Sequence, residues 1–264
     1  MNSPATHSTV PSERLLARLE KATSLCVLTG AGISVESGLA TFRDPGGLWE
    51  EYSPADLANE AAFRRDPQLV QGWYQARLKQ ALTAEPNEGH LALVELEKFY
   101  EPFLLVTQNV DTLHKRAGSI NMVELHGNIV DERCTDCSKP PVDEVFLEDG
   151  LRCCGFCGGL LRPGVVWFGE SLPMDPIERA TDAAISSDVF LSVGTSSIVY
   201  PAAGLPLLAK QNGAYVVEIN VEPSALSYAM DEVVLGPAGD ILPVLAAHMR
   251  SFNNREELER ITNR

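Results

Sequence analysis

The strongest constraint on the fold is an apolar stretch that ends in two closely spaced glycines. Residues 25–28 form a β-favouring run, and Gly30 and Gly32 follow it almost directly. A buried strand that turns into a glycine loop is typical of phosphate-binding sites, because glycine lets the backbone approach a pyrophosphate closely. The dinucleotide fingerprint G-x-G-x-x-G is broken here, since Val35 occupies the third glycine position. The stretch therefore predicts an unusual nucleotide loop, and an ordinary tight turn is the alternative.

Predicted helices separate the predicted strands along most of the chain. Strand-like apolar runs cover residues 25–28, 103–107, 122–125, 188–193, 215–219 and 233–235. Helical patterns cover, among others, residues 12–21, 87–98, 177–185, 203–211 and 240–249. This alternation predicts an α/β fold built on a doubly wound, parallel, Rossmann-like sheet.

Two segments interrupt the alternation and predict a smaller inserted lobe. Residues 53–87 form a helical module with a break at Pro67, and residues 131–159 form a zinc-binding module with two C-x-x-C pairs. We expect ligands in the cleft between this lobe and the main domain. The discontinuous Rossmann-like domain is assigned to residues 12–52, 88–130 and 160–250.

The cysteine spacing is the most specific motif in the chain. Cys134 and Cys137 are followed, after sixteen residues, by Cys154 and Cys157. This spacing is typical of a four-cysteine zinc ribbon, and four protein ligands imply a structural rather than a catalytic metal. Cys153 lies beside the second pair, but the C-x-x-C spacing and the Gly-Gly that follows select Cys154.

Composition narrows the function and the compartment. With 264 residues and 45% apolar residues, the chain has the size and composition of a soluble globular protein. We find no apolar run of about 18 residues and no apolar signal segment in the first eleven residues, so we expect a cytoplasmic protein without membrane association. The net charge of −15 argues against nucleic-acid binding. It fits basic partners such as lysine-bearing protein segments, although a solvated acidic surface is the alternative.

Polar side chains follow the predicted strands at the edge where open α/β sheets bind their ligands. His126 is a general-base candidate among them, because the ordinary pKa of histidine lies near neutrality. The other strand-end residues are Gln108, Asn109, Asp111, Gly194, Thr195, Ser196 and Asn220.

Three further features have a functional and a structural interpretation. Tyr74 and Arg77 share a face of a predicted helix and could bind an anionic group, or they could be an ordinary surface pair. Phe42 and Arg43 could cover a bound cofactor, or could be one buried aromatic and one surface charge. Residues 165–168 could expose a strand edge that pairs with an extended peptide.

The ordered set of motifs resembles the sirtuin family of NAD-dependent protein-lysine deacylases. The motifs are Gly-Ala-Gly-Ile-Ser, Thr-Phe-Arg, Thr-Gln-Asn-Val-Asp, Leu-His-Gly, the two C-x-x-C pairs, Val-Val-Trp-Phe-Gly-Glu and Gly-Thr-Ser. The resemblance extends from about residue 15 to residue 245. It implies that NAD is consumed as a co-substrate, in a site formed by Gly30, Ala31, Gly32, Ser34, Phe42, Arg43, Trp49, Gln108, Asn109, Asp111, Gly194, Thr195, Ser196, Asn220 and Ala238.

The resemblance also implies the reaction and its partners. The acyl oxygen of an acylated lysine of another protein attacks the ribose and expels nicotinamide. His126 and Asn109 are the implied catalytic residues, and His126 acts as the base on the ribose hydroxyls. The products are free lysine, nicotinamide and 2′-O-acyl-ADP-ribose. Val166 and Phe168 are expected to contact the peptide, and the zinc ion only stabilises the small lobe.

The pair Tyr74 and Arg77 resembles the Tyr-x-x-Arg signature of class III sirtuins, which remove succinyl, malonyl and glutaryl groups. Thr41 replaces the acidic residue that many deacetylases have at this position. Because bacterial members with this signature also deacetylate, we expect succinyl, malonyl and acetyl groups as substrates. An ADP-ribosyltransferase and a non-catalytic NAD-sensing module are the alternatives, whereas the broken fingerprint at Val35 disfavours a dehydrogenase.

Overall fold

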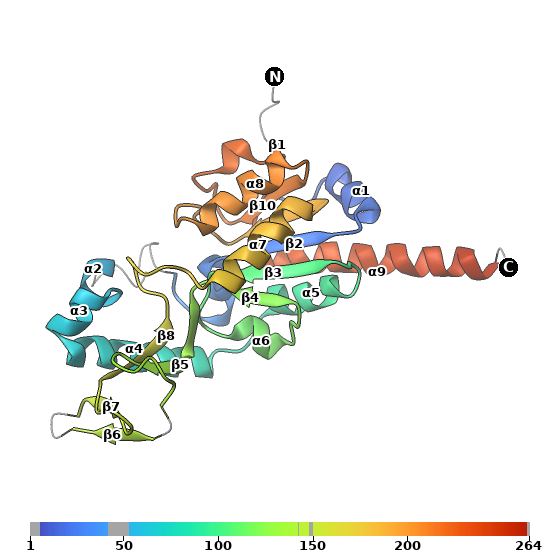
Figure 1. Ribbon diagram of the computed structural model, residues 1–264. Coiled ribbons are helices and arrows are strands. Elements are labelled where there is room, and N and C mark those ends of the chain that lie inside the picture. Colours follow the sequence, from blue (N-terminus) through green and yellow to red (C-terminus); the bar gives the residue numbers. More distant parts are fainter. Residues whose placement is uncertain (1–5, 42–52, 142, 148–149, 263–264) are drawn as a thin grey trace.

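A seven-stranded parallel sheet forms the centre of the molecule (Figure 1). The computed structural model describes residues 6–41, 53–141, 143–147 and 150–262. All strand pairs in the sheet are parallel. The strands lie in the order β1 (Thr6–Ser8), β11 (Glu232–Leu235), β10 (Tyr215–Asn220), β9 (Val189–Val193), β2 (Leu25–Thr29), β3 (Phe103–Thr107) and β4 (Met122–Glu124).

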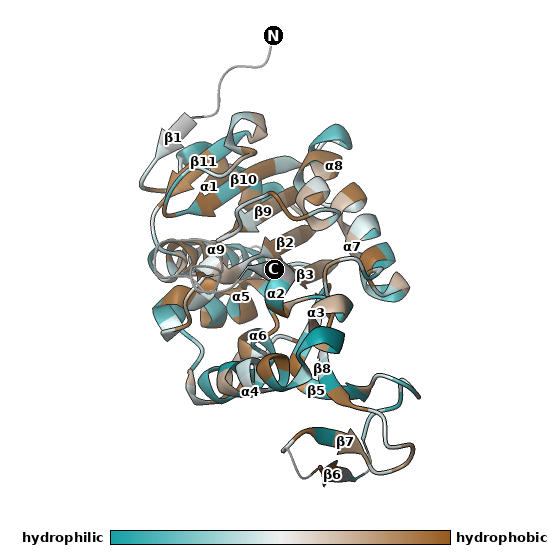
Figure 2. Ribbon diagram, turned by 90° about the vertical axis from the view of Figure 1, so that its left-hand side faces the viewer, coloured by the Kyte–Doolittle hydropathy of each residue, from teal (hydrophilic) through white to brown (hydrophobic). Residues whose placement is uncertain are grey.

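Helices cover both faces of this sheet. One face packs against α1 (Glu13–Lys21), α5 (Glu88–Glu97) and α9 (Ala238–Thr262), and the other against α7 (Met174–Ser186) and α8 (Leu205–Gln211). Strand β2 shows why: Leu25 and Val27 belong to the first core cluster, and Cys26 and Leu28 belong to the second. A strand that is buried on both faces is apolar at every position, as the brown central strands in Figure 2 illustrate.

The order of the strands determines where a ligand can bind. The chain passes from β2 to β3 and then to β4 on one side. It then returns to β9, on the other side of β2, and continues outward to β10 and β11. The sheet therefore has its topological switch point between β2 and β9, and open α/β sheets bind their ligands outside the carboxyl ends of the strands at such a point.

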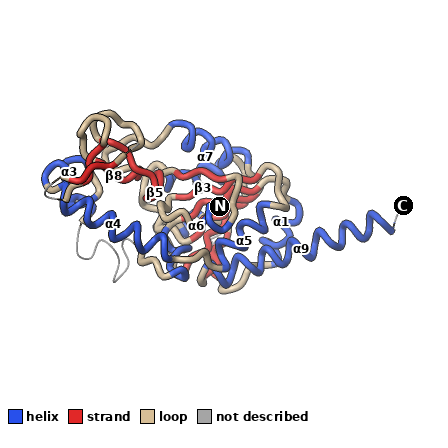
Figure 3. The backbone as a smooth tube through the Cα atoms, turned by 90° about the horizontal axis from the view of Figure 1, so that it is seen from below, coloured by secondary structure: helices blue, strands red, loops and turns tan. Residues whose placement is uncertain are grey.

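The helical segment and the cysteine segment lie together, away from the sheet (Figures 1 and 3). Phe63, Val70 and Tyr74 of the helical segment form one core with Ile129, Val165 and Trp167, which flank the cysteine segment. The helix α4 (Pro67–Thr83) begins as the sequence predicts, because the side chain of Asp66 accepts a hydrogen bond from the backbone N–H of Leu69 over 2.9 Å. The elements are α2 (Pro54–Leu57), α3 (Glu60–Arg65), α4 (Pro67–Thr83), the antiparallel pair β5 (Gly127–Cys134) and β8 (Leu161–Val165), and the antiparallel pair β6 (Glu144–Phe146) and β7 (Arg152–Cys154).

The structure adds to the sequence prediction at three places. The short strand β1 extends the six predicted strands to seven, although its segment is polar. The last helix runs beyond the predicted residue 249 to Thr262, and its end projects from the body of the molecule (Figure 3). The glycine loop continues into a 3-10 helix, η1 (Ala31–Ser37), which ends at Gly38 with a φ of 83°. The remaining short helices are α6 (Leu113–Ala117), η2 (Ala202–Gly204) and η3 (Ser227–Ala229).

Candidate active site

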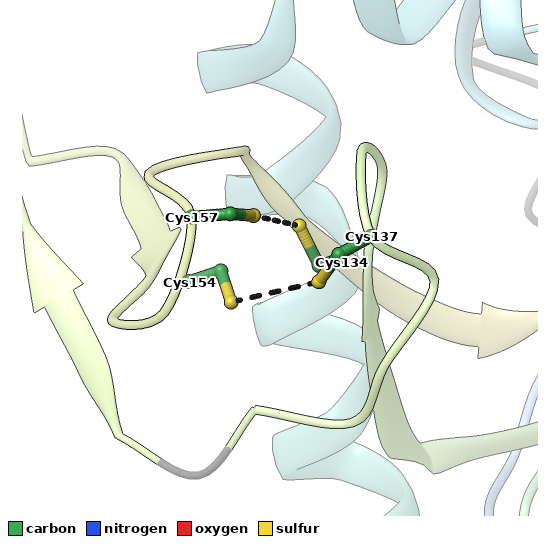
Figure 4. A group of neighbouring side chains, drawn as sticks. All are labelled: Cys134, Cys137, Cys154 and Cys157. Atoms are coloured by element: carbon green, nitrogen blue, oxygen red, sulfur yellow. Dashed lines mark hydrogen bonds between the residues drawn. The ribbon is translucent and has the colours of Figure 1, made fainter.

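The four predicted cysteines form a compact cluster (Figure 4). Cys134 and Cys137 come from the end of β5 and the turn after it, and Cys154 and Cys157 from the end of β7 and its turn. The four sulfur atoms lie within 4.8 Å of one another. Thiolates around a tetrahedral zinc ion are about 3.8 Å apart, as follows from Zn–S bonds of about 2.3 Å. The donor set and its spacing therefore fit a structural zinc ion.

Cys153 is outside this cluster, as the sequence predicts. Successive side chains of a strand point to opposite faces, so Cys153 and Cys154 of β7 cannot both face the other three sulfur atoms. Cys153 is buried, with 3% of its surface exposed. The four cysteines supply a full set of four ligands without any residue from another part of the chain. The segment that contains them lies away from the sheet (Figure 1).

The glycine loops after β2 and β9 pack directly against each other. The backbone N–H of Gly32 donates to the carbonyl oxygen of Gly194 over 2.8 Å, and that of Gly30 donates to Val193 over 3.0 Å. A Cβ atom on Gly30 would lie 2.7 Å from the carbonyl oxygen of Gly194. The glycines are thus required for contact between the two loops. This is a different reason from the expected one, in which their main role is to let a pyrophosphate approach.

A cleft of about 1010 Å³ opens at the carboxyl ends of the strands. Its volume is at the upper end of the range for small-molecule sites, about 300–1,000 Å³. Fifteen of the predicted site residues line it: Gly30, Ala31, Gly32, Tyr74, Arg77, Gln108, Asn109, His126, Val166, Phe168, Gly194, Thr195, Ser196, Asn220 and Ala238. The fold therefore brings together residues that are up to 208 positions apart, from Gly30 to Ala238 (238 − 30).

Two predicted residues, Ser34 and Asp111, line a smaller pocket beside this cleft. The hydroxyl of Ser34 donates to the carboxylate of Asp111 over 2.7 Å and accepts from the side-chain amide of Asn109 over 3.2 Å. The same amide donates to the carbonyl oxygen of Gly30 over 3.1 Å. This network fixes the side chain of Asn109 between the first glycine loop and Asp111.

A second group of hydrogen bonds converges on Thr195 from the neighbouring strand ends. The side-chain amide of Gln108 donates to the Thr195 hydroxyl over 3.2 Å, and that of Asn220 donates to the Thr195 carbonyl oxygen over 3.1 Å. These bonds join the ends of β3, β9 and β10 across the mouth of the cleft. The polar strand ends therefore hold one another in place at the edge of the cleft.

A hydrogen bond to the backbone fixes the tautomer of His126. Its Nδ1 lies 3.1 Å from the carbonyl oxygen of Gln108, and a carbonyl can only accept, so Nδ1 carries the hydrogen. The lone pair of the neutral ring is then on Nε2. Burial lowers the pKa of His126 below its ordinary value, although the bond to Gln108 acts in the opposite direction. The ring is consequently neutral at physiological pH and able to accept a proton.

Tyr74 and Arg77 both line the cleft from the helix α4. Arg77 donates to the carbonyl oxygen of Ala40 and to the side-chain oxygen of Gln80, each over 3.2 Å. Burial lowers the pKa of Arg77 and Asp111 raises it, and arginine remains charged at neutral pH. Among the described residues that line the cleft, Arg77 is the one lysine or arginine side chain.

The segment of residues 165–168 borders the cleft, and its amide groups are already engaged. The backbone N–H of Val166 donates to the carbonyl oxygen of His126 over 2.8 Å, and that of Phe168 donates to the carbonyl oxygen of Ala58 over 2.9 Å. The N–H of Trp167 donates to the carboxylate of Glu170 over 2.9 Å. A peptide that pairs with this segment would have to donate its own N–H groups to the carbonyl oxygens of the segment.

The sequence did not single out several side chains that line the cleft. Trp167 belongs to the motif Val-Val-Trp-Phe-Gly-Glu, and Ile129, Glu36 and Ser224 had no distinguishing pattern around them. A long-range contact would have been needed to place them, because they come from separate elements. The predicted cofactor residues Phe42, Arg43 and Trp49 lie outside the described residues.

The chain matches known proteins over most of its length. The model of the Sir2 family matches residues 30–201. An NAD-dependent protein deacylase of Pyrobaculum aerophilum is 51% identical over 88% of this chain and 94% of its own length. The NAD-dependent protein deacylase of Pyrococcus furiosus is 48% identical over 89% of this chain and 96% of its own length.

The fold of this chain also matches solved structures of Sir2 proteins. A complex of a Sir2 homologue with NAD has a TM-score of 0.84 and 42% identity, over 94% of this chain and 97% of that chain. A mutant Sir2 homologue bound to 2′-O-acetyl ADP ribose has a TM-score of 0.84 and 42% identity, over 91% and 97%. A complex of Sir2, p53 peptide and NAD+ has a TM-score of 0.78 and 28% identity, over 93% and 99%. The protein therefore belongs to the Sir2 family, the sirtuins.

Proposed function

We propose that this protein is an NAD-dependent protein deacylase that removes acyl groups from lysine side chains and transfers them to ADP-ribose. The relatives with 51% and 48% identity carry the name of this activity. The observation that carries the proposal is the position of His126, Asn109 and the two glycine loops in one cleft. We further propose that acyl groups with a terminal carboxylate, such as succinyl and malonyl, are substrates, with acetyl also accepted.

In this proposal, NAD binds at the switch point of the sheet as a co-substrate. It supplies the ribose whose bond to nicotinamide is broken. Gly30, Ala31 and Gly32 lie beside its pyrophosphate, while Gly194, Thr195, Ser196, Asn220 and Ala238 hold the adenosine half. Gln108, Asn109 and Asp111 hold the nicotinamide half, and Asn109 is oriented for this by Ser34. The relative that was solved as an NAD complex supports this placement, because it shares the fold over 94% of this chain.

His126 is the proposed general base. Its neutral ring accepts a proton from a ribose hydroxyl at Nε2, while Nδ1–H stays bonded to the carbonyl oxygen of Gln108. The fixed carbonyl partner keeps the ring in the required tautomer and in a constant orientation. General-base catalysis of this kind contributes about 10²- to 10⁴-fold to a rate.

The acidic acyl preference is supported by the charge of the cleft. The charged lining residues on α4 include Arg77, while Glu36, Glu170 and Glu222 line other parts of the cleft. A carboxylate therefore has its favourable binding place beside Arg77. A guanidinium binds a carboxylate with two parallel hydrogen bonds, and the hydroxyl of Tyr74 lies on the same helical face. An acyl chain without a carboxylate would leave the partly buried cation without this partner, which favours the acidic substrate.

The proposed peptide site is the border of the cleft at residues 165–168, where Val166 and Phe168 contact the substrate. Phe168 is 49% exposed, which suits a side chain that covers a bound peptide. The peptide complex among the solved relatives supports a protein substrate for this fold. The acidic surface of the chain is compatible with a lysine-bearing peptide.

An assay with labelled NAD tests the reaction class. The protein is incubated with NAD and a lysine-acylated peptide, and the fate of the ADP-ribose label is followed by mass spectrometry. A deacylase produces O-acyl-ADP-ribose and unmodified peptide in equal amounts. Label that accumulates on the peptide or on the protein, without any O-acyl-ADP-ribose, would replace the proposal with an ADP-ribosyltransferase.

A further inference from the structure

The indole of Trp167, which lines the cleft, makes one directed hydrogen bond. Its Nε1–H donates to the hydroxyl oxygen of Tyr74 over 3.0 Å. Trp167 is 2% exposed and Tyr74 is 8% exposed, so water competes little for this bond. Both side chains line the cleft, and both belong to the same hydrophobic core cluster.

The chemistry of the two groups fixes the direction in which Tyr74 can act. An indole N–H can only donate, whereas a tyrosine hydroxyl has one hydrogen and two acceptor positions. Trp167 therefore occupies an acceptor position and leaves the hydrogen of Tyr74 for a different partner. Burial raises the pKa of Tyr74 to about 12, although the bond from Trp167 acts in the opposite direction. The hydroxyl consequently keeps this hydrogen at neutral pH.

The neighbours of Trp167 hold the indole in this orientation. The guanidinium of Arg162 lies 3.3 Å from the centre of the indole ring, and the ring of Phe63 lies 5.4 Å away. Glu170 binds Arg162 through its carboxylate and also accepts the backbone N–H of Trp167 over 2.9 Å. The indole N–H is thus a preorganised donor toward Tyr74, and reorienting it would disrupt these contacts.

We propose that Trp167 is a positioning residue for acyl selectivity, which orients the Tyr74 hydroxyl as a donor toward the carboxylate of an acidic acyl group. This inference rests on the proposed function, in which Tyr74 and Arg77 bind that carboxylate. A donor at this place stabilises a carboxylate oxygen and offers no hydrogen bond to an alkyl chain. The contribution of Trp167 is therefore specific to acidic acyl groups.

The test replaces Trp167 with phenylalanine and compares two peptides that differ only in the acyl group, succinyl-lysine and butyryl-lysine. Trp167→Phe keeps an aromatic ring for Arg162 and Phe63 to pack on and removes the N–H donor. We expect the KM for the succinyl peptide to rise about 5- to 10-fold, the effect of one weakened hydrogen bond to a charged group. The kcat/KM for the butyryl peptide should change by a smaller factor, so the ratio of succinyl to butyryl kcat/KM falls, because the carboxylate is the group that loses a hydrogen bond.

A double-mutant cycle shows whether the effect passes through Tyr74. In the Tyr74→Phe background, Trp167→Phe should cause no further change in the ratio of succinyl to butyryl kcat/KM. A further selective loss in that background would overturn the inference. Equal losses on both peptides would also overturn it, because they would show that Trp167 only supports the fold.

A second variant distinguishes the loss of the N–H donor from a loss of folding. A tryptophan analogue with sulfur in place of the N–H group, benzothienylalanine, keeps the size and the ring contacts at position 167. It should reproduce the KM change of Trp167→Phe, with unchanged thermal unfolding. An analogue that behaves like the native protein on both peptides would contradict the role of the N–H group.

The same data separate this inference from the proposed function. If Tyr74→Phe and Arg77→Met leave the ratio of succinyl to butyryl kcat/KM unchanged, the proposed acyl preference is wrong and the inference is rejected with it. If those two variants lower the ratio and Trp167→Phe does not, only the role of Trp167 is wrong.

Discussion

The cysteine cluster and the cleft are built in opposite ways. All four cysteines come from 24 consecutive residues, 134 to 157, and their sulfur atoms close on one another. The residues that line the cleft are spread from Gly30 to Ala238 and meet only because the parallel strands end at the same edge. The cluster is thus a local structure, in which one short segment supplies all four metal ligands. The cleft, in contrast, depends on the whole fold.

The two regions control different properties of the protein. A closed set of four ligands has no position for a substrate, so the cluster contributes stability. The cleft contains side-chain atoms that are available to a ligand, such as Nε2 of His126, because Nδ1 is the ring atom that bonds to the backbone. Changes at the cluster should therefore affect fold and activity together, and changes in the cleft should affect activity alone.

The largest effect is expected from Cys154→Ser. Loss of one thiolate should release the zinc ion and lower the free energy of unfolding by several kcal/mol, because metal binding and folding are coupled. Activity on every acyl peptide should be lost with it. Zinc content by mass spectrometry and thermal unfolding are the measurements.

Cys153→Ser is the matched control for that variant. It changes the adjacent buried thiol in the same way, and it should retain one zinc ion per chain. A zinc content that falls equally in both variants would show that the assignment of Cys154 over Cys153 is wrong.

His126→Ala should separate activity from stability. We expect kcat to fall about 10²- to 10⁴-fold, the usual contribution of a general base, with NAD affinity and the melting temperature unchanged. Steady-state kinetics and calorimetric NAD titration measure these quantities. The control is His248→Ala, because His248 lies on α9 and pairs with Glu20. Native activity in His126→Ala would remove the proposed base from the mechanism.

Arg77→Met should lower activity on acidic acyl groups more than activity on neutral ones. We expect kcat/KM for a succinyl-lysine peptide to fall about 10- to 100-fold, because a carboxylate loses a charged hydrogen-bonding partner. The value for an acetyl-lysine peptide should change little. Lys79→Met removes one positive charge from the exposed side of the same helix and serves as the control. Equal losses on the two peptides would assign Arg77 a purely structural role.

The smallest effect is expected from pH. Burial lowers the pKa of His126 from 6.5, so the base is still neutral at pH 6.5 and becomes protonated below it. The kcat/KM for an acetyl-lysine peptide should therefore be constant above this value and fall about tenfold per pH unit on the acid side. The same shift stabilises the fold above pH 6.5 and loses this contribution as the pH falls, because the unfolded chain binds the proton first. An acid limb centred above pH 7 would contradict the assignment.

The contrast between the two regions also explains what sequence could predict. The C-x-x-C spacing identified the four cysteines, and the spacing together with the following Gly-Gly excluded Cys153, because both ligand pairs are local. Strand ends predicted Gln108, Asn109, His126 and the second glycine loop, since parallel strands all end at one edge. The predicted α/β sheet was also confirmed. Its strands could be predicted because their apolar runs are continuous.

Other features depend on contacts that no local pattern encodes. The packing of Gly32 on Gly194 joins loops that lie 162 residues apart (194 − 32) and was not predicted. The bond from Trp167 to Tyr74 spans 93 residues. Strand β1 is polar and short, so only its pairing with β11 at the edge of the sheet makes it a strand.

We propose that the cleft transfers acyl groups with a terminal carboxylate to ADP-ribose. A competition assay tests it most directly: equal amounts of one peptide, acylated with either succinyl or acetyl on the same lysine, react together with NAD. The ratio of the two O-acyl-ADP-ribose products at early times equals the ratio of the kcat/KM values. We predict that both products form and that O-succinyl-ADP-ribose is in clear excess. An excess of O-acetyl-ADP-ribose would contradict the account.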